Sequence, residues 1–307
     1  MQNISWLAAI ACLAAAPAAA QSCDVVRLAD VGWTDNMAQN GIAANVLNAL
    51  GYETEITLLS LPITFESLAN NDIDVFLDQW LPSMEGMIAP YVQAGTIDVI
   101  GPTLEGAKYT LATNTAGAAL GIADFADVVQ HADVLESQMF GVEPGNDGNT
   151  LILDVMAKNE FGFGAFTLVE TSEQAMLAEV TRLTEDGTPA VWLAWEPHPM
   201  NVDLDITYLT GGDAYFGPNF GGATVYTNTR AGYVAECPNT GKLLTNMKFT
   251  LQMENEIMGA ILNAGADPRD AAKAWLMANP TAWEGWFDGV TTKDGGDARA
   301  AVTAALQ

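Results

Sequence analysis

Short apolar runs alternate along the chain with segments whose apolar residues recur at helical spacing, which is the pattern of an α/β fold. The expected strands cover 24–29, 52–61, 73–77, 98–100, 107–113, 139–142 and 190–194. The expected helices cover 34–50, 65–69, 85–94, 122–128, 150–158, 175–183, 239–253, 254–265 and 267–277. Thr34 or Asp35 is expected to cap the first long helix, and Gly51 to close it.

Three tryptophans, Trp33, Trp80 and Trp195, each follow directly on an expected strand. Open α/β sheets bind ligands beyond the carboxyl ends of their strands, so these rings are placed to face a ligand. Asp35 lies on the same turn as Trp33, and a large ring beside an acid suits a cation. Each tryptophan taken singly is equally well explained as a core residue, but the repeated placement favours a site. The tryptophans without this placement are expected to be structural, namely Trp192, Trp275, Trp283 and Trp286.

The charge of the chain limits the kinds of partner. Its 307 residues are half hydrophobic, which is enough for two domains with sizeable cores. The formal charge of −27, from 38 acids and 11 bases, argues against nucleic acid and anionic membranes because both would be repelled. A small cation would be attracted, although solubility alone explains most of the acidity.

The first twenty residues have the character of a secretory signal. Residues 1–20 are largely apolar and end in an A-x-A pattern, so we expect cleavage after Ala20, although no Lys or Arg precedes the apolar stretch. No later apolar run is long enough to span a membrane, so the sequence predicts a periplasmic protein without an anchor. Cleavage leaves Cys23 and Cys237, and an even pair in an oxidising compartment favours a disulfide over two buried thiols.

Such a disulfide would pack late sequence against early sequence. We therefore expect one lobe built from both chain ends, residues 21–112 and 213–307, and a second lobe built from residues 113–212. The fold class predicted is α/β, with two lobes joined by two hinge connections.

Four stretches carry a family resemblance: residues 32–36, residues 71–82, Tyr109 and residues 195–201. In this order they resemble the periplasmic choline-binding members of the glycine betaine and proline betaine binding family, which serve ABC importers. The likeness covers essentially the whole mature chain, including the cysteine pair. It implies a type II periplasmic binding protein whose two lobes close over a quaternary ammonium compound. Pro199 departs from the family pattern, in which an aromatic or larger residue is typical at that place.

The resemblance also implies roles for individual residues. Four rings would form an aromatic box around the trimethylammonium group, and two polar side chains would accompany it. The rings are Trp33, Trp80, Tyr109 and Trp195, and the polar contacts are Asp35 and Asn146. From the residues alone, Tyr109 could equally be core, Asp35 a helix cap and Asn146 a turn residue.

The acid decides the ligand that we expect. Asp35 favours a net cation such as choline, whereas the carboxylate of glycine betaine needs donors. The expected partners are choline, an ABC permease and its ATPase subunit, with a monomeric protein and no metal or cofactor. Alternatives are a carrier of glycine betaine or trimethylamine N-oxide, a ligand-sensing subunit, or a periplasmic enzyme using Asp35 and Glu196 as acid and base. The sequence has two histidines, no Cys/His metal spacing and no G-x-S-x-G motif, which disfavours the enzyme.

Overall fold

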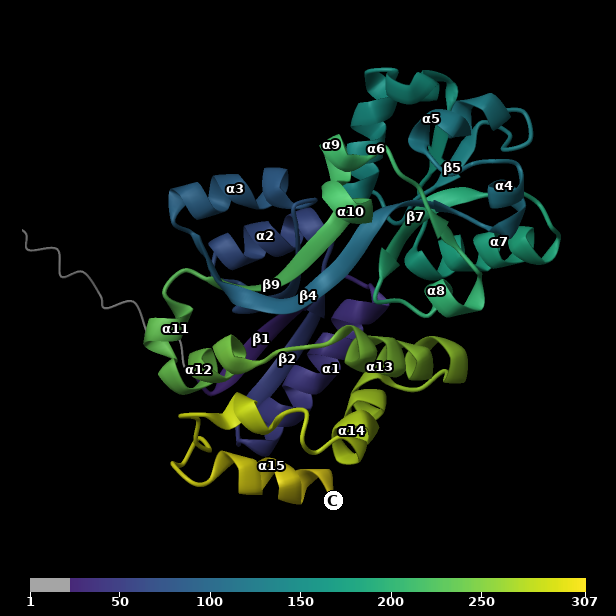
Figure 1. The fold of residues 1–307 in the computed structure, drawn as a ribbon. Coiled ribbons are helices and arrows are strands. Elements are labelled where there is room, and N and C mark those ends of the chain that lie inside the picture. The colour runs from purple at the N-terminus through teal and green to yellow at the C-terminus, as the bar shows by residue number, and fades with distance from the viewer. Residues whose placement is uncertain (1–22) are drawn as a thin grey trace, which may run out of the picture.

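The computed structural model describes residues 23–307, so the expected signal segment, residues 1–20, lies outside the described residues. Figure 1 shows two lobes. Lobe 1 contains the purple, blue and yellow elements from both ends of the described chain and most of the green ones, and lobe 2 contains the teal elements from its middle. Two short green helices, at 213–216 and 218–221, lie between the lobes beside the teal helix at 147–157. In the part of the chain that the structure describes, no helix is long and apolar enough to cross a membrane.

The elements follow one another largely as the hydrophobic pattern predicts. The strands are β1 (Val25–Asp30), β2 (Glu53–Leu58), β3 (Val75–Leu81), β4 (Ile97–Thr113), β5 (Gln138–Phe140), β6 (Thr167–Val169), β7 (Val191–Glu196), β8 (Thr207–Tyr208) and β9 (Gly222–Arg230). The helices of the first half are α1 (Thr34–Ala49), α2 (Leu61–Ala69), α3 (Glu85–Ala94), α4 (Thr115–Ala119), α5 (Phe125–Val128) and α6 (Asp147–Ala157). Those of the second half are α7 (Glu173–Glu185), α8 (Met200–Asp203), α9 (Asp213–Phe216), α10 (Pro218–Gly221), α11 (Tyr233–Glu236), α12 (Pro238–Asn246), α13 (Leu251–Ala264), α14 (Pro268–Ala278) and α15 (Ala298–Leu306). Three 3₁₀ turns complete the set, at Val129–His131, Glu160–Ala165 and Glu284–Phe287.

One curled sheet runs through both lobes in the order β2-β1-β3-β9-β4-β7-β5-β6, with β8 also paired to β4. The outer strands pair in parallel, β1 with β2 and β3, and β5 with β6 and β7. The central strand β4 is antiparallel to β9 over its length up to Lys108 and to β7 from Lys108 onward. Because β4 changes neighbours in this way, it is one of the chain crossings between the lobes, as Figure 1 shows.

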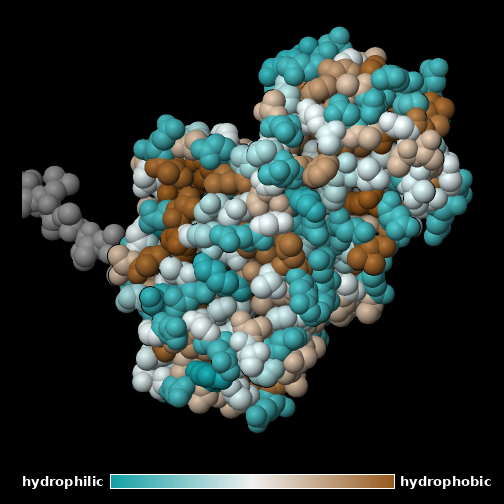
Figure 2. Space-filling model, viewed as in Figure 1, coloured by the Kyte–Doolittle hydropathy of each residue, from teal (hydrophilic) through white to brown (hydrophobic). Residues whose placement is uncertain are grey.

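Helices cover both faces of the sheet in lobe 1. Helix α1 packs against α13, α14 and α15, while α2 and α3 pack together near β4 and β9. Cys23 and Cys237 form the expected disulfide, with their Cα atoms 5.6 Å apart across a separation of 214 residues. The bond joins the start of the described chain to the residue between α11 and α12, so late sequence packs against early sequence in lobe 1. On the face drawn in Figure 2, apolar residues gather on the side of lobe 1 where α2 and α3 lie, and hydrophilic residues cover much of the rest.

Two element predictions were wrong because of tertiary pairing. The expected strands 98–100 and 107–113 are one strand, β4, which accommodates Gly101 and Pro102 through irregular register against β9. The expected helix 239–253 is two helices, since the backbone N–H of Phe249 donates to the carbonyl of Thr103, 2.7 Å away, between α12 and α13. A sequence pattern cannot reveal a hydrogen bond to a strand more than a hundred residues earlier.

The predicted cap of α1 was also wrong. Trp33 is the N-cap residue and makes no side-chain cap bond. The hydroxyl of Thr34 instead donates to Glu173, 2.7 Å away. The carboxylate of Asp35 accepts from the adjacent backbone N–H of Asn36. Trp80 and Trp195 lie within β3 and β7 and not after them, because both strands extend further than their apolar runs.

Gly41 allows α1 and α14 to pack closely. A Cβ atom at this position would lie 2.5 Å from the carbonyl oxygen of Pro268, which is backbone and cannot swing aside. We expect Gly41→Ala to lower the free energy of unfolding by about 1–3 kcal/mol, despite the better helix propensity of alanine. Gly259→Ala in α13 is the matched control, since a Cβ there meets no atom within 4 Å and should stabilise slightly. Urea denaturation of both variants checks this, and equal stabilisation of the two would contradict it.

Candidate ligand-binding site

The turn after β1 places Trp33 and Asp35 at the carboxyl edge of lobe 1. Gly32 has φ +87°, which favours glycine, and its N–H donates to Asp30. The side chain of Asn36 accepts from the N–H of Val31 at 3.0 Å, which closes the turn. The local sequence therefore fixes the backbone from which the ring of Trp33 and the carboxylate of Asp35 project.

The other three rings come from the strands in the middle of the sheet. Trp80 lies on β3, Tyr109 on β4 and Trp195 on β7, and Tyr109 is the register partner of Trp195. The ring centroids of Trp80 and Tyr109 are 5.9 Å apart, and those of Tyr109 and Trp195 are 6.4 Å apart with an interplanar angle of 82°. These three strands are neighbours or near neighbours in the sheet, which brings residues far apart in sequence together.

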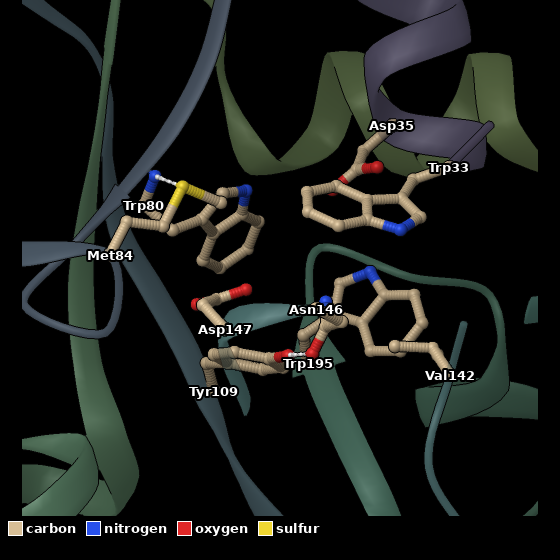
Figure 3. Close-up of a pocket in the computed structure, with 9 residues that line it drawn as sticks. All are labelled: Trp33, Asp35, Trp80, Met84, Tyr109, Val142, Asn146, Asp147 and Trp195. Carbon is tan, nitrogen blue, oxygen red and sulfur yellow. Dashed lines mark hydrogen bonds between the residues drawn. The ribbon is translucent and has the colours of Figure 1, made fainter. Parts of the chain in front are cut away.

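The four rings enclose a small cavity, which Figure 3 shows from the side. Each ring residue is 4–7% exposed, and the cavity has an empty volume of about 290 Å³. Because the four rings leave so little space between them, the site suits a compact molecule. The residues that line it are Trp33, Asp35, Trp80, Met84, Tyr109, Val142, Asn146, Asp147 and Trp195.

Two polar residues enter the cavity from the start of α6. Asn146 caps this helix by accepting from the N–H of Asn149, and its Oδ1 also accepts from the hydroxyl of Tyr109 at 2.9 Å. Its amide nitrogen points toward the rings in Figure 3. Asp147 is 2% exposed, and neither of its carboxylate oxygens has a hydrogen-bond partner among residues 23–307. The carboxylate of Asp147 projects between Trp80 and Tyr109.

The structure brings all six residues predicted from the sequence into one cavity. It adds three that sequence reasoning missed, namely Met84, Val142 and Asp147. Asp147 follows Asn146 directly, and a helix start with two polar residues is a signal that could have found it. Met84 lies four residues after Trp80, and its sulfur accepts from the backbone N–H of Trp80. Nothing in the sequence marks Val142.

A family model matches most of the described chain. It is OpuAC, the substrate binding domain of ABC-type glycine betaine transport systems, and it matches residues 24–278. The chain belongs to this family. Its members are substrate-binding proteins of ABC transporters, so the enzyme alternative is excluded and the two-lobed α/β fold predicted from the sequence is confirmed.

Solved structures of OpuAC-type proteins resemble the chain closely. An ABC-transporter choline-binding protein in complex with choline is 57% identical, with a TM-score of 0.91, over 93% of this chain and 99% of that one. The same percentages hold for an ABC-transporter choline-binding protein in an unliganded semi-closed conformation, but the TM-score is 0.85. A further relative, the uncharacterized protein ORF1 of Chromohalobacter salexigens, is 44% identical over 132 residues, which are 43% of this chain and 85% of that protein. The TM-score is higher with the choline complex than with the unliganded structure, so the arrangement of the two lobes here is more similar to that in the liganded structure.

Carboxylates without a cationic partner dominate the electrostatics of this family member's cavity. Burial, with the negative charge of Glu173 as the next cause, raises the pKa of Asp35 to about 8. Burial also raises the pKa of Glu143 to about 7 and that of Asp147 to about 6. No Lys, Arg or His belongs to the cavity lining within the described residues. Among residues 23–307, no positively charged side chain of the lining balances these acids, so a bound cation would stabilise their ionised forms.

Acidic side chains behind the rings hold two of them in place. The indole N–H of Trp33 donates to Glu143, and that of Trp80 donates to Asp78, each at a distance of 2.9 Å. The amide of Gln39 donates to both Asp78 and Glu254. Burial is the main cause that raises the pKa of Asp78 and of Glu254 well above the usual range. Hydrogen bonds to acidic side chains thus orient the rings of Trp33 and Trp80, and among the described residues no positively charged group is placed near the cavity by this arrangement.

Proposed function

We propose that this protein captures choline in the periplasm and delivers it to an ABC permease. The observation that carries the proposal is a cavity walled by four aromatic rings and two buried carboxylates, with no Lys, Arg or His in its lining among residues 23–307. The similarity to the choline complex described above supports it. Trp33, Trp80, Tyr109 and Trp195 would surround the trimethylammonium group.

Aromatic rings suit a quaternary ammonium because this group has no N–H to donate. Burying it breaks no strong hydrogen bond, and ring faces replace water through cation–π attraction of about 0.5–2 kcal/mol each. Four rings and a carboxylate can therefore supply the roughly 8 kcal/mol of a micromolar complex after the costs of ordering. A primary amine would leave its N–H donors facing rings and should bind more weakly.

The charges favour choline over glycine betaine. Elsewhere in lobe 1, buried Asp74 is bonded to Arg27 and Arg230, and the hydrogen bonds from these arginines overcome burial and lower its pKa. Asp35 and Asp147 are buried to a similar extent, but among residues 23–307 no arginine or lysine lines their cavity. A cationic ligand would supply the positive charge that Arg27 and Arg230 supply to Asp74. A zwitterion brings a carboxylate as well, which two acids would repel. The amide of Asn146 is suited to the hydroxyl of choline.

The transport role follows from closure of the lobes. Asp35 and Trp33 belong to lobe 1 and Asn146 to lobe 2, so a ligand that touches all three bridges the lobes. We place the lobe boundaries at 112/113 and 212/213, with a cleaved signal at 1–20 and a monomeric mature protein. The closed form would be recognised by the permease and its ATPase subunit in the inner membrane.

A calorimetric titration of the mature protein, refolded free of carried-over ligand, tests the proposal. We expect micromolar or tighter binding of choline and much weaker binding of glycine betaine. The reverse order would mean that backbone donors hold a carboxylate and that the protein carries an osmoprotectant. Absence of heat with either ligand would overturn the choline assignment and leave trimethylamine N-oxide as the next candidate.

The acid on lobe 1 should set the preference for a net cation. We expect Asp35→Asn to weaken choline binding by about tenfold or more, because a charge-assisted contact in a buried site is lost. Glycine betaine should lose less, since its carboxylate is relieved of a repulsion. Asp133→Asn, at an exposed position, changes the net charge equally and should leave both affinities unchanged. Equal losses for the two ligands in Asp35→Asn would remove the charge argument.

A further inference from the structure

Two glutamates of lobe 2 hold the turn that carries Trp33. Glu143 precedes α6 and accepts from the indole N–H of Trp33, 2.9 Å away. Glu173 is the first residue of α7 and accepts both the N–H and the hydroxyl of Thr34, at 2.8 and 2.7 Å. These bonds connect segments 110 and 139 residues apart, and all of them cross from one lobe to the other.

Glu173 is the more completely engaged of the two acids. It is 1% exposed, and its Oε1 also receives a bond from Nε2 of His198 at 3.0 Å. Nδ1 of His198 accepts from the N–H of Met200, so the ring is the neutral form with its proton on Nε2, directed at Glu173. The same ring packs on Trp195 at a centroid distance of 4.9 Å. Glu173 therefore links the turn bearing Trp33 to the strand end bearing Trp195.

We propose that Glu173 is the positioning residue that keeps the two lobes closed over the ligand, by bonding Thr34 across the cleft. The inference rests on the proposed function only in needing a ligand that closes the lobes. Glu173 does not line the cavity, and the bonds it accepts from Thr34 exist only when the lobes are together. Loss of these bonds should therefore speed release of the ligand and leave its capture by the open form unchanged.

Charge and hydrogen bonding at Glu173 must be separated, because its charge also acts on Asp35. Glu173→Gln removes the charge. It also places an amide N–H, which is a donor, opposite one of the donors that Glu173 accepts from, namely Thr34 or His198. Thr34→Val keeps every charge and the shape of the side chain, and removes only the hydroxyl donor. Glu179→Gln, on the outer face of the same helix, is the matched control, since the carboxylate of Glu179 accepts from Arg182 of that helix and not from the described residues of lobe 1.

Stopped-flow tryptophan fluorescence with choline gives the two rate constants. We expect Glu173→Gln to raise the dissociation rate constant about tenfold, Thr34→Val to raise it several-fold, and Thr34→Ser to restore it, with association rates unchanged throughout. Small-angle scattering of choline-saturated Glu173→Gln should show a more open particle than wild type or Glu179→Gln. Unchanged dissociation in Thr34→Val, whatever Glu173→Gln does, would overturn the inference.

Failure of the ligand assignment would be seen separately. If the wild-type protein bound glycine betaine and not choline, the proposed function would fail, and the same rate ratios measured with glycine betaine would still test the role of Glu173.

Discussion

Trp195→Ala is expected to weaken choline binding by at least about tenfold while the protein stays folded. The substitution removes one cation–π wall, worth about 0.5–2 kcal/mol, and opens the cavity to water on the side of Tyr109. The ring of His198, which is bonded to Glu173, also packs against Trp195, so the substitution removes this ring contact as well. Isothermal titration of the variant measures the loss.

Trp192→Phe is the control for this experiment. Trp192 lies on the same strand, three residues earlier, and therefore faces the opposite side of the sheet, where it is fully buried. Its replacement should lower the melting temperature and leave the choline affinity unchanged. Unaltered affinity in Trp195→Ala would mean that the four rings do not form the cation site.

Choline affinity is expected to rise by at least about tenfold between pH 5 and pH 8. Burial is the main cause that raises the pKa values of Asp35 and Asp147 in the cavity, and of Glu143 behind Trp33, to about 8, 6 and 7. A cation binds better to the ionised acids, so protons must be released on binding, and below each pKa this costs about 1.4 kcal/mol per pH unit. Titrations at several pH values, in buffers of different ionisation enthalpy, measure both the affinity and the protons released.

The same shifts affect the stability of the unliganded protein. An acid whose pKa is raised by folding stabilises the folded state at low pH, and this contribution is lost as the pH rises through the folded-state pKa values of about 6 to 8. The melting temperature without ligand should therefore fall from pH 5 to pH 8, and the increase produced by choline should grow.

The acids around Asp35 allow this pH dependence to be assigned. Besides burial, the negative charges of Glu173 and Glu143 raise the pKa of Asp35. The charge of Asp35 adds in the same way to the effect of burial on the pKa values of Asp78 and Glu254. Neither of the two histidines lines the cavity. Asp35→Asn should therefore flatten the pH dependence of choline affinity. A profile as steep as that of wild type in this variant would contradict the assignment.

The sequence by itself determined the order of elements and most of the site. The alternation of apolar runs with helical patterns suffices for the α/β class, because side-chain period and burial are local properties of each segment. The cysteine pair predicted that late sequence packs on early sequence. The six site residues came from tryptophans near strand ends and from the family resemblance, and the structure places them in one cavity.

Only the tertiary structure decided where the polar groups find their partners. Thr34 has a side chain that can cap its own helix, yet it donates to Glu173, which lies 139 residues later. Asp147 resembles any acid at a helix start until the sheet brings β3 and β4 against it and leaves its oxygens without a bond. Burial and hydrogen bonding between distant segments depend on how the lobes meet, and this depends on the whole fold, so no local pattern contains it.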